Sequence, residues 1–547
     1  MGAARVIMPW TWHDPYYFVT AVQYLLWPYV RPYELVRTSA AVGLIPHFLI
    51  FSFSHFLIFS FSHSLIIHSS SCFLLLASFF ASSMPAPLLA NTARLLALSV
   101  ALARGSAGAA SRPAAAFVVT GHWTSTGDIS SPQRCQTTMN AAARLPTSDR
   151  VQKTLDPCVI LMKQIISRHA EKWEDRGGIY SLAQGVVWWK PPAEALEAVA
   201  AAATSDDTLH TYCPDEGTVE LRSALAEKLA TENALDDVNI IVTSGANQAY
   251  VNVVLTLLSE GDKCVVFRPY YFNHVMAIQM TRGEESLLVG PTGEDGVPDL
   301  DWLKSQLEED KSIRFVTIVN PGNPTGTSLS RAYLEEAVRL CEDYGAWLVM
   351  DNTYEHFDHS GANGSSSSED TPAFWCSSKE HVINIFSFSK AFALAGFRVG
   401  YVAINKGPRG EEAYEQMLKV QDTIPICPAR VSQIAALASI GSGREWVAER
   451  VKTLDGGRQA ILNALSPLEN IMGGTGAMYV MAKLPVGMDD KQLANDLVER
   501  YGVAVIPGSF CGYPQWIRVC YSNLPPDKCL DAASRLATGI KELCVQN

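Results

Sequence analysis

The chain has 547 residues, 48% of them hydrophobic, and carries a formal net charge of −12 with a pI near 5.5. This length is enough for two or more domains, and the acidic balance argues against a nucleic-acid-binding protein, which is usually basic. The 12 cysteines form no CxxC pair and no zinc-ligand spacing. They therefore indicate reduced, mostly buried thiols in an intracellular protein.

The N-terminal segment differs in composition from the rest. Residues 38–93 contain no Asp, Glu, Lys or Arg, and HFLIFSFS occurs twice in tandem, from His47 and from His55. The run is long and apolar enough for a membrane span, but FSFS alternates with the period of a strand. Three interpretations of the leader, residues 1–83, stay open: a gene-model or untranslated-region artefact, a signal anchor, and a disordered leader.

Residues 84–150 are rich in Ala, Ser and Arg and contain no acidic residue before Asp128. This composition is typical of an organelle transit peptide, so Met84 or Met139 could be the true start. We expect a cytoplasmic protein. The alternatives are a plastid or mitochondrion if 84–150 is a transit peptide, and membrane association if 38–83 is genuine.

From about residue 155 the pattern is α/β. Amphipathic stretches such as 331–345 alternate with short β-rich runs, which predicts a mainly parallel sheet covered by helices on both faces. Ligands of such sheets bind at the carboxyl ends of the strands. We assign 151–220 to an N-terminal arm and 221–408 to a large domain. The expected strands are 239–245, 263–269, 313–321, 346–354, 381–390 and 399–405.

The pattern changes near residue 409, and 409–547 are predicted to form a smaller α+β domain. It begins with a long helix over 444–465. Strands are then expected at 478–485, 503–508 and 516–522, and helices at 491–502 and 526–543. The run SSSSED, residues 365–370, is predicted to be a polar surface insertion.

One lysine stands between apolar stretches in SFSKAFALAGFRVGY, residues 387–401. Apolar surroundings disfavour a charged ammonium, so Lys390 is a candidate nucleophile. The alternative is an ordinary surface lysine at the end of a strand.

Two further motifs follow predicted strands. VTSGANQAY, residues 242–250, opens a helix whose N-terminal amides favour an anion, and Asn247 and Gln248 add amide donors. NPGNPTGTSLS, residues 320–330, is a rigid loop able to hold Asn323 toward a ligand oxygen. Each could also be a plain turn.

A carboxylate ends the apolar run in WLVMDNTYEHF, residues 347–357. Asp351 would be costly to bury there without a cation, and a protonated ring nitrogen would serve; the alternative is a helix-capping Asp. Tyr354 can reach the same ligand. Together with Lys390, the anion cradle and Asn323, this set matches the requirements of pyridoxal 5′-phosphate (PLP): an aldehyde, a phosphate, a pyridine nitrogen and a phenolic oxygen.

Residues 181–543 resemble the class I and II aminotransferases of PLP fold type I. The resemblance rests on an ordered motif set: YxxxxG at Tyr212 and Gly217, SGANQA, NPGNPTG, DNTY and SFSKxxxxxGFR. It implies a seven-stranded, mainly parallel sheet sandwiched by helices, a smaller C-terminal domain and a homodimer with shared active sites. The stretches SLAQGVVWWKPP, YCPDEG and VQDTIPIC are similar to plant aromatic aminotransferases, which use methionine and aromatic 2-oxo acids such as indole-3-pyruvate.

The resemblance also implies residue roles. Lys390, Asp351 and Tyr354 would be catalytic, with Lys390 bound covalently to the aldehyde and Asp351 paired with the pyridine N–H. The residues implied in holding the cofactor are Lys390, Asp351, Asn323, Tyr354, Gly245, Ala246, Asn247, Tyr270, Tyr271, Ser387, Arg398 and, from a second subunit, Tyr212. The residues implied in binding substrate are Arg518, Gly185, Trp189 and Asn323. No metal is implied.

The sequence leaves alternatives open for both the substrate and the activity. Trp188, Trp189, Tyr270 and Tyr271 could line an apolar substrate pocket, or the tryptophans could be packing residues. The sequence offers no obvious second arginine for a dicarboxylate. A PLP-dependent C–S lyase or an enzyme like the synthase of the ethylene precursor would share the lysine motif. A non-catalytic scaffold or regulator is a third reading, although it would be free to lose Lys390 or Asp351, and both are present.

Overall fold

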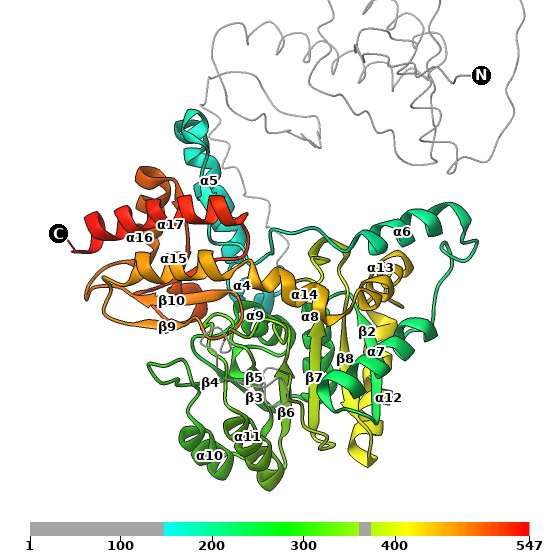
Figure 1. Ribbon diagram of the computed structural model, residues 1–547. Coiled ribbons are helices and arrows are strands. Elements are labelled where there is room, and N and C mark those ends of the chain that lie inside the picture. Colours follow the sequence, from blue (N-terminus) through cyan, green and yellow to red (C-terminus); the bar gives the residue numbers. More distant parts are fainter. Residues whose placement is uncertain (1–146, 360–373, 546–547) are drawn as a thin grey trace, which may run out of the picture. The chain divides into compact units, whose positions relative to one another are not determined.

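The computed structural model describes residues 147–359 and 374–545 (Figure 1). The predictions for the leader, for the transit-like segment up to residue 146 and for the insertion at 365–370 lie outside these residues. Within the described part, none of the helices combines the length and apolar character that crossing a membrane requires.

A seven-stranded sheet forms the centre of the fold, in the order β2-β8-β7-β6-β5-β3-β4. Only β8 runs antiparallel to its neighbours, so the predicted mainly parallel sheet is confirmed. The six expected strands are all present, and β4 is a seventh that the sequence reading did not identify. The strands are β2 (Val238–Thr243), β3 (Lys263–Phe267), β4 (Leu287–Gly290), β5 (Ile313–Val319), β6 (Trp347–Asp351), β7 (Val382–Ser387) and β8 (Gly400–Asn405).

Helices cover both faces of this sheet, which explains why most residues of its inner strands are apolar and buried. Successive strand residues point to opposite faces: Phe315 belongs to the cluster under α8, α9 and α12, whereas Val316 packs under α10 and α11. Each such buried side chain contributes roughly 1.5–3 kcal/mol. The helices are α7 (Val219–Asn233), α8 (Ala246–Leu257), α9 (Phe272–Thr281), α10 (Leu300–Glu309), α11 (Arg331–Tyr344) and α12 (Pro408–Thr423).

The C-terminal part contains a four-stranded antiparallel sheet in the order β12-β13-β10-β9. Its strands are β9 (Ile471–Gly473), β10 (Tyr479–Lys483), β12 (Ile506–Pro507) and β13 (Trp516–Cys520). The helices of this part are α13 (Arg430–Gly441), α14 (Gly443–Lys452), α15 (Asp455–Leu465), α16 (Asp490–Asp496) and α17 (Pro526–Ile540), the last two continuing as short π-helices.

The single helix predicted over 444–465 is wrong, because α14 and α15 are separate helices. The break precedes the pair Gly456–Gly457. A β-carbon on Gly457 would lie 2.7 Å from Cys529 Sγ, so this glycine allows α15 to approach α17 closely. Helical periodicity alone does not report such a change of direction.

The N-terminal arm consists of α4 (Asp149–Lys153), α5 (Cys158–Trp173), β1 (Tyr180–Ser181) and α6 (Ala193–Ser205). Its first helix, α4, packs on α9, where Arg150 Nη1 donates to the Thr281 carbonyl at 2.9 Å, whereas α5, β1 and α6 pack against the C-terminal part. Strand β1 pairs in parallel with β11 (Val503–Ala504), and the buried Trp173 donates its indole N–H to the Glu499 carbonyl at 3.3 Å. The domain boundaries at 151–220, 221–408 and 409–547 stay a prediction.

Candidate active site

Strand register brings the sequence motifs to one edge of the central sheet. Thr243 at the end of β2 pairs with Gly400, which pairs in turn with Ser387 at the end of β7. Asp351 at the end of β6 pairs with Val319 and Ile385 on its two neighbours. The loops that carry the predicted anion cradle, the nucleophile, the carboxylate and the amide therefore leave the sheet side by side, as the strand-end argument requires.

The anion cradle lies at the start of α8. Gly245, at φ +83°, precedes the first helical amides and provides no side-chain cap for them. A β-carbon on Gly245 would lie 2.5 Å from Arg398 Nη2, so the guanidinium faces these amides across a gap that only glycine leaves open. Arg398 is held by a bond from Nη1 to the Ala395 carbonyl at 3.0 Å. Helix amides and a guanidinium together suit a phosphate.

Gln248 is not part of this cradle, contrary to the sequence interpretation. Its Oε1 accepts a bond from the Ser244 amide, and its Nε2 donates to Gln421 Oε1 at 2.9 Å. Asn247 stays at the cradle, where its Oδ1 accepts a bond from the Tyr271 hydroxyl at 3.3 Å. Ser387 Oγ accepts a hydrogen bond from the Ser389 amide at 3.1 Å, and this bond fixes the loop that leads to Lys390.

Lys390 is partly buried, and its Nζ donates a hydrogen bond to the Gly185 carbonyl. Burial lowers the pKa of this amine to about 8, helped by the positive charges of Arg518 and Arg398 and opposed by Cys520 and Asp351. A substantial share of the amine is therefore neutral at mildly alkaline pH. This is the state that a nucleophile or proton acceptor needs.

Cofactor-free protein should show this lowered pKa directly. We expect acetylation of Lys390 by a brief pulse of acetic anhydride to rise with pH through a midpoint near 8, because only the neutral amine reacts. Lys406 is the internal control, since the carboxylate of Asp237 raises the pKa of its exposed ammonium. Mass spectrometry of the two peptides gives both profiles. Identical midpoints for the two lysines would contradict the assignment.

Asp351 is a buried carboxylate held by neighbours on two sides. His274 Nε2 lies 3.2 Å from its Oδ2, and the Thr353 hydroxyl donates to its Oδ1 at 2.6 Å. Burial by itself would raise the pKa of Asp351, but the bonds from His274 and Thr353 outweigh it and hold that pKa below its usual value. The Asp351 carboxylate is therefore ionised at neutral pH, which suits a cationic ligand nitrogen.

His274 was not recognised from the sequence. It lies in the first turn of α9 and stacks on Tyr250 with ring centroids 4.0 Å apart. A histidine among the apolar residues of FNHVMAIQMT carries no distinctive spacing. The feature that could have indicated a role for His274 was the presence of a polar residue on the buried face of a helix.

A chain of side-chain hydroxyl and amide groups continues from the carboxylate motif. Asn323 Nδ2 donates to the Tyr354 hydroxyl at 3.3 Å, and the hydroxyls of Tyr354 and Tyr479 lie 2.8 Å apart. Tyr479, on β10, is a second residue that the sequence reading missed. The proposed pair of donors to a phenolic oxygen, Asn323 and Tyr354, is thus brought together by two loops of the large sheet.

Arg518 is buried on β13 and joins this chain from the other sheet. Its Nη1 donates to Asn323 Oδ1 at 3.1 Å and its Nη2 to the Ala183 carbonyl at 2.8 Å, while its buried Nε has no hydrogen-bond partner among the described residues. An unsatisfied donor on a buried guanidinium is costly unless a ligand accepts it. A β-carbon on Gly185 would overlap the Tyr479 hydroxyl, so glycine is required beside this arginine.

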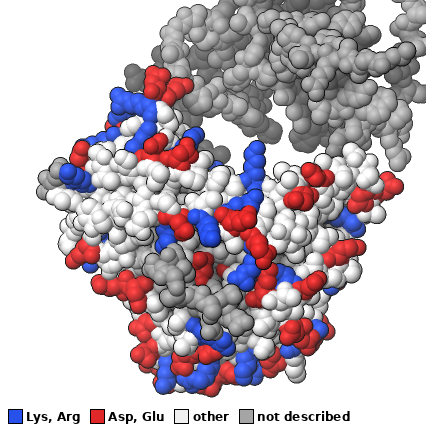
Figure 2. Space-filling model, in the orientation of Figure 1, with Lys and Arg blue, Asp and Glu red and all other residues white. Residues whose placement is uncertain are grey.

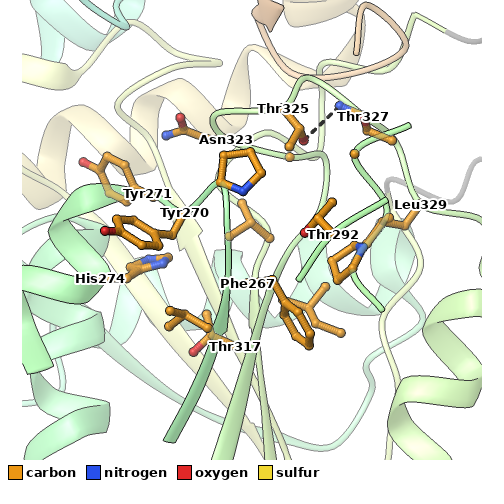
Figure 3. Close-up of a pocket in the computed structure, with 17 residues that line it drawn as sticks. Phe267, Tyr270, Tyr271, His274, Thr292, Thr317, Asn323, Thr325, Thr327 and Leu329 are labelled. Atoms are coloured by element: carbon orange, nitrogen blue, oxygen red, sulfur yellow. Dashed lines mark hydrogen bonds between the residues drawn. The ribbon is translucent and has the colours of Figure 1, made fainter. Parts of the chain in front are cut away.

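Of the two adjacent tyrosines, Tyr271 faces the site. It bonds Asn247, and its ring meets His274 edge-on at 5.2 Å. Tyr270 packs instead against Gly512, where a β-carbon would lie 2.5 Å from its ring. Figure 3 shows both rings with His274 and Asn323 at one end of a small cavity that extends toward Thr292 and Thr327.

Two predicted residues lie apart from this cluster. Tyr212 is on a loop and is 76% exposed. Trp189 is a core residue: it stacks on Phe357 with centroids 6.2 Å apart and donates its indole N–H to the Ala391 carbonyl at 3.2 Å. Trp189 therefore supports the backbone next to Lys390, and its direct contact with a substrate stays a prediction.

The chain was compared with known proteins. A family model described as "Aminotransferase class I and II" matches residues 178–536. The chain is 43% identical over 397 residues to "Aromatic aminotransferase ISS1" of Arabidopsis thaliana, covering 72% of this chain and 96% of that protein. It is 30% identical to a bifunctional aspartate aminotransferase and glutamate/aspartate-prephenate aminotransferase of Petunia hybrida, covering 63% and 73%.

Solved structures agree with these matches. The aromatic aminotransferase from Pyrococcus horikoshii OT3 superimposes with a TM-score of 0.60 at 26% identity, over 70% of this chain and 99% of the other. A single mutant of the Thermus thermophilus aspartate aminotransferase gives a TM-score of 0.62 at 26% identity, over 72% and 100%.

Proposed function

The chain belongs to the class I and II aminotransferases, and on that premise we propose that it is a PLP-dependent transaminase for methionine and aromatic amino acids. The amino group would pass to a 2-oxo acid of the phenylpyruvate or indole-3-pyruvate type in two half-reactions, with ping-pong kinetics. The observation that carries the proposal is the arrangement of Lys390, Asp351 and Arg398 at adjacent strand ends.

The described residues fit PLP group by group. Arg398 and the gap at Gly245 form a cradle for its phosphate. The ionised Asp351 suits a protonated pyridine nitrogen, and the bonded pair Asn323 and Tyr354 suits a phenolic oxygen. Lys390 supplies the amine for the aldehyde. When bound, PLP supplies an electron-accepting ring that stabilises negative charge at the substrate α-carbon.

The residues of the chain do the remaining work. Arg518 binds the substrate α-carboxylate, for which its unpartnered Nε is a free donor. Lys390 Nζ, neutral once released, would accept the substrate α-proton and would then donate it to the cofactor carbon from which this amine was released. Asp351 keeps its negative charge throughout, because His274 and Thr353 favour the ionised form.

Substrate class is the finer part of the proposal. Support comes from the 43% identical relative, whose printed name is an aromatic aminotransferase, and from Tyr271 at the site. Trp189 packs on Phe357 beside the Lys390 loop, so its own contact with a substrate stays a prediction. Arg518 serves one carboxylate, so the second carboxylate of aspartate or glutamate has no assigned cation.

An amino-acid panel tests this choice. With methionine as donor and phenylpyruvate as acceptor we expect phenylalanine to form, with kcat/KM about tenfold or more above that for aspartate with 2-oxoglutarate, because a dicarboxylate would leave one charge unpaired. Product is measured by chromatography. Equal or reversed preference would contradict the substrate class. Ammonia or a thiol released from methionine without acceptor would indicate the lyase alternative.

We also propose a homodimer in which Tyr212 reaches the phosphate site of the other subunit. The 76% exposure of this tyrosine supports the dimer, as does the exposure of Ile424 and Ile426. These isoleucines belong to the segment after α12, which the residue next to Tyr212, Cys213, contacts through the Pro428 carbonyl. Analytical ultracentrifugation tests the dimer, and a monomer at micromolar concentration would contradict it. The cytoplasmic location stays a proposal, and N-terminal mass spectrometry of the native protein would show whether 1–150 is retained.

A further inference from the structure

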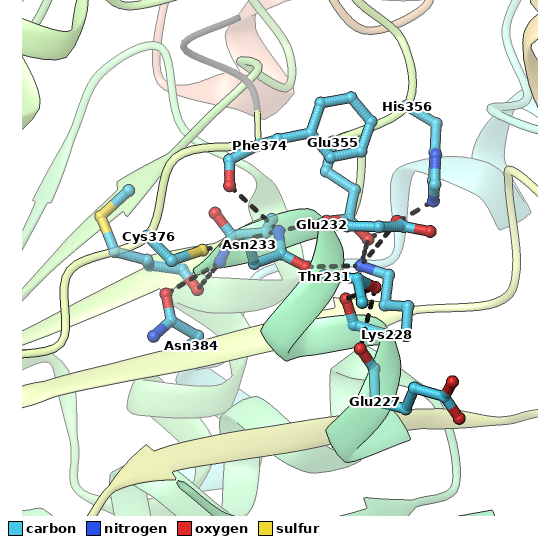
Figure 4. Close-up of polar contacts among 12 residues, drawn as sticks. Glu227, Lys228, Thr231, Glu232, Asn233, Glu355, His356, Phe374, Cys376 and Asn384 are labelled. Carbon is cyan, nitrogen blue, oxygen red and sulfur yellow. Dashed lines mark hydrogen bonds and ion pairs between the residues drawn. The ribbon is translucent and has the colours of Figure 1, made fainter. Parts of the chain in front are cut away.

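A buried group of charged and polar side chains joins the end of α7 to the turn after β6 (Figure 4). Lys228 Nζ lies 2.6 Å from Glu355 Oε1, and the two side chains are only 9% and 7% exposed. Asn233 Nδ2 donates to the other carboxylate oxygen, Oε2, at 2.9 Å, and Lys228 Nζ donates to Asn233 Oδ1 at 2.8 Å. Both oxygens of Glu355 are therefore bonded.

This group touches two segments that carry the active site. Glu355 directly follows Tyr354, whose hydroxyl bonds Asn323. The Lys228 ammonium also lies 5.0 Å from the ring centroid of Phe386, which precedes Ser387 at the end of β7. One cation thus contacts the turn that presents the tyrosine and the strand that leads to the nucleophile.

The turn over residues 352–357 fixes Tyr354 and Glu355 relative to each other. The Glu355 amide bonds the Asn352 carbonyl at 3.0 Å, and the Phe357 amide bonds the Tyr354 carbonyl at 2.8 Å. Tyr354 reaches into the site toward Tyr479, whereas its neighbour Glu355 reaches back to α7. Because Tyr354 is bonded to Tyr479 and the adjacent Glu355 is bonded to α7, the tyrosine ring has little freedom to shift.

Stability alone does not account for the group. Burial would raise the pKa of Glu355, but the Lys228 charge and the hydrogen bonds from Lys228 and Asn233 outweigh it and hold that pKa below its usual value. Burial also lowers the pKa of His356 to about 4, so this ring is neutral at neutral pH and the ion pair is the charged feature. A buried ion pair of this kind can often be replaced by apolar side chains without loss of stability, so stability is weak evidence for its presence.

We propose that Lys228 and Glu355 are positioning residues that hold the Tyr354 hydroxyl, and through Phe386 the Lys390 loop, in the geometry that binds the cofactor. This inference rests on the proposed function. Neither residue touches the cofactor or substrate. Their effect is carried by the turn over residues 352–357 and by the end of β7.

A double-mutant cycle separates a role in positioning the Tyr354 hydroxyl from a role in stabilising the fold. The variants are the apolar pair Lys228→Met with Glu355→Leu, Tyr354→Phe, and all three changes together. PLP affinity of cofactor-free protein is measured by fluorescence titration, and hydrogen exchange of the peptide over 351–357 is measured in the same protein. The matched control is Lys406→Met with Asp237→Asn, which removes a surface pair of the same 2.6 Å length.

We expect the apolar pair to melt within a few degrees of wild type, to exchange faster at 351–357, and to lose about tenfold in PLP affinity and in kcat with little change in KM. In the Tyr354→Phe background the apolar pair should cost clearly less, because only the contact through Phe386 remains to be lost. The surface control should match wild type in every measurement.

Equal losses with and without the Tyr354 hydroxyl, or unchanged exchange at 351–357, would overturn the inference. If the apolar pair does not fold, Glu355→Gln takes its place in the same cycle, because glutamine keeps the bond to Lys228 and loses the acceptor for Asn233. Wild-type protein that fails to transaminate would count against the proposed function. The exchange measurement, made without cofactor, would still decide the positioning role.

Discussion

Replacing Lys390 with alanine is expected to reduce turnover by about 10⁴-fold or more while the fold is retained. Lys390 Nζ is both the proposed point of covalent attachment and the base for the substrate α-proton, and the described residues around it offer no second amine. Within the described residues, Nζ makes one hydrogen bond, to the Gly185 carbonyl. Turnover is measured with methionine and phenylpyruvate at saturating PLP.

Two controls frame this result. Lys406→Ala removes an exposed lysine and should leave both activity and melting temperature unchanged. Borohydride treatment of wild type, followed by digestion, should yield a pyridoxyl-modified peptide containing Lys390, and the alanine variant should yield none. Full multiple-turnover activity in Lys390→Ala would refute the assignment.

Replacing Asp351 with alanine should lower kcat by about 10³-fold, because the buried negative charge opposite the cofactor ring nitrogen is lost. The same change leaves His274 Nε2 without its acceptor at 3.2 Å, which we expect to cost about 1–3 kcal/mol of folding stability. Activity is assayed at saturating PLP, and unfolding is followed in parallel so that the two losses are separated.

Asp351→Asn sharpens the comparison, since it keeps the shape and a hydrogen-bond acceptor but removes the charge. We expect it to be nearly as inactive as the alanine variant and clearly more stable. Asp310→Ala, which breaks a surface pair with Lys263, is the control for loss of a carboxylate. An asparagine variant with wild-type kcat would show that charge at this position is not needed.

The sheet was predictable from sequence because its inner strands are mostly apolar, with few polar residues such as Arg314 and Thr317 in β5. Runs such as IRFVTIV and WLVMD are covered on both faces, so they differ sharply from the amphipathic stretches between them. Strand β4 was missed for the opposite reason: it is four residues long, lies at the edge of the sheet, and most of it is only partly buried.

The candidate site was predictable where the chemistry is local. Lys390, Asp351 and Asn323 each stand at the end of a strand, so one rule about parallel sheets brings them together. His274 and Tyr479 lie far from these motifs in sequence, and neither belongs to a motif of its own. Their roles follow from packing: one supports the carboxylate from α9, and the other bonds Tyr354 from the second sheet.

The aromatic residues show that the residue type alone does not predict which side chains face the site. For Trp189 the sequence left two roles open, a substrate-pocket wall and a packing residue, and the structure shows its ring stacked on Phe357. Tyr270 and Tyr271 are adjacent and chemically identical, and only the backbone direction at the start of α9 decides which ring faces the site. Sequence does not report that direction.

The reversed direction of β8 has a consequence for how this enzyme can vary. Lys390 ends the outgoing arm and Arg398 begins the returning arm of one antiparallel hairpin, with Ser387 paired to Gly400 at its base. The spacing between nucleophile and phosphate anchor is thus an internal property of about a dozen residues. Insertions in the helices or surface loops can accumulate without altering it, whereas one residue added between positions 390 and 398 would change the reach of both groups at once.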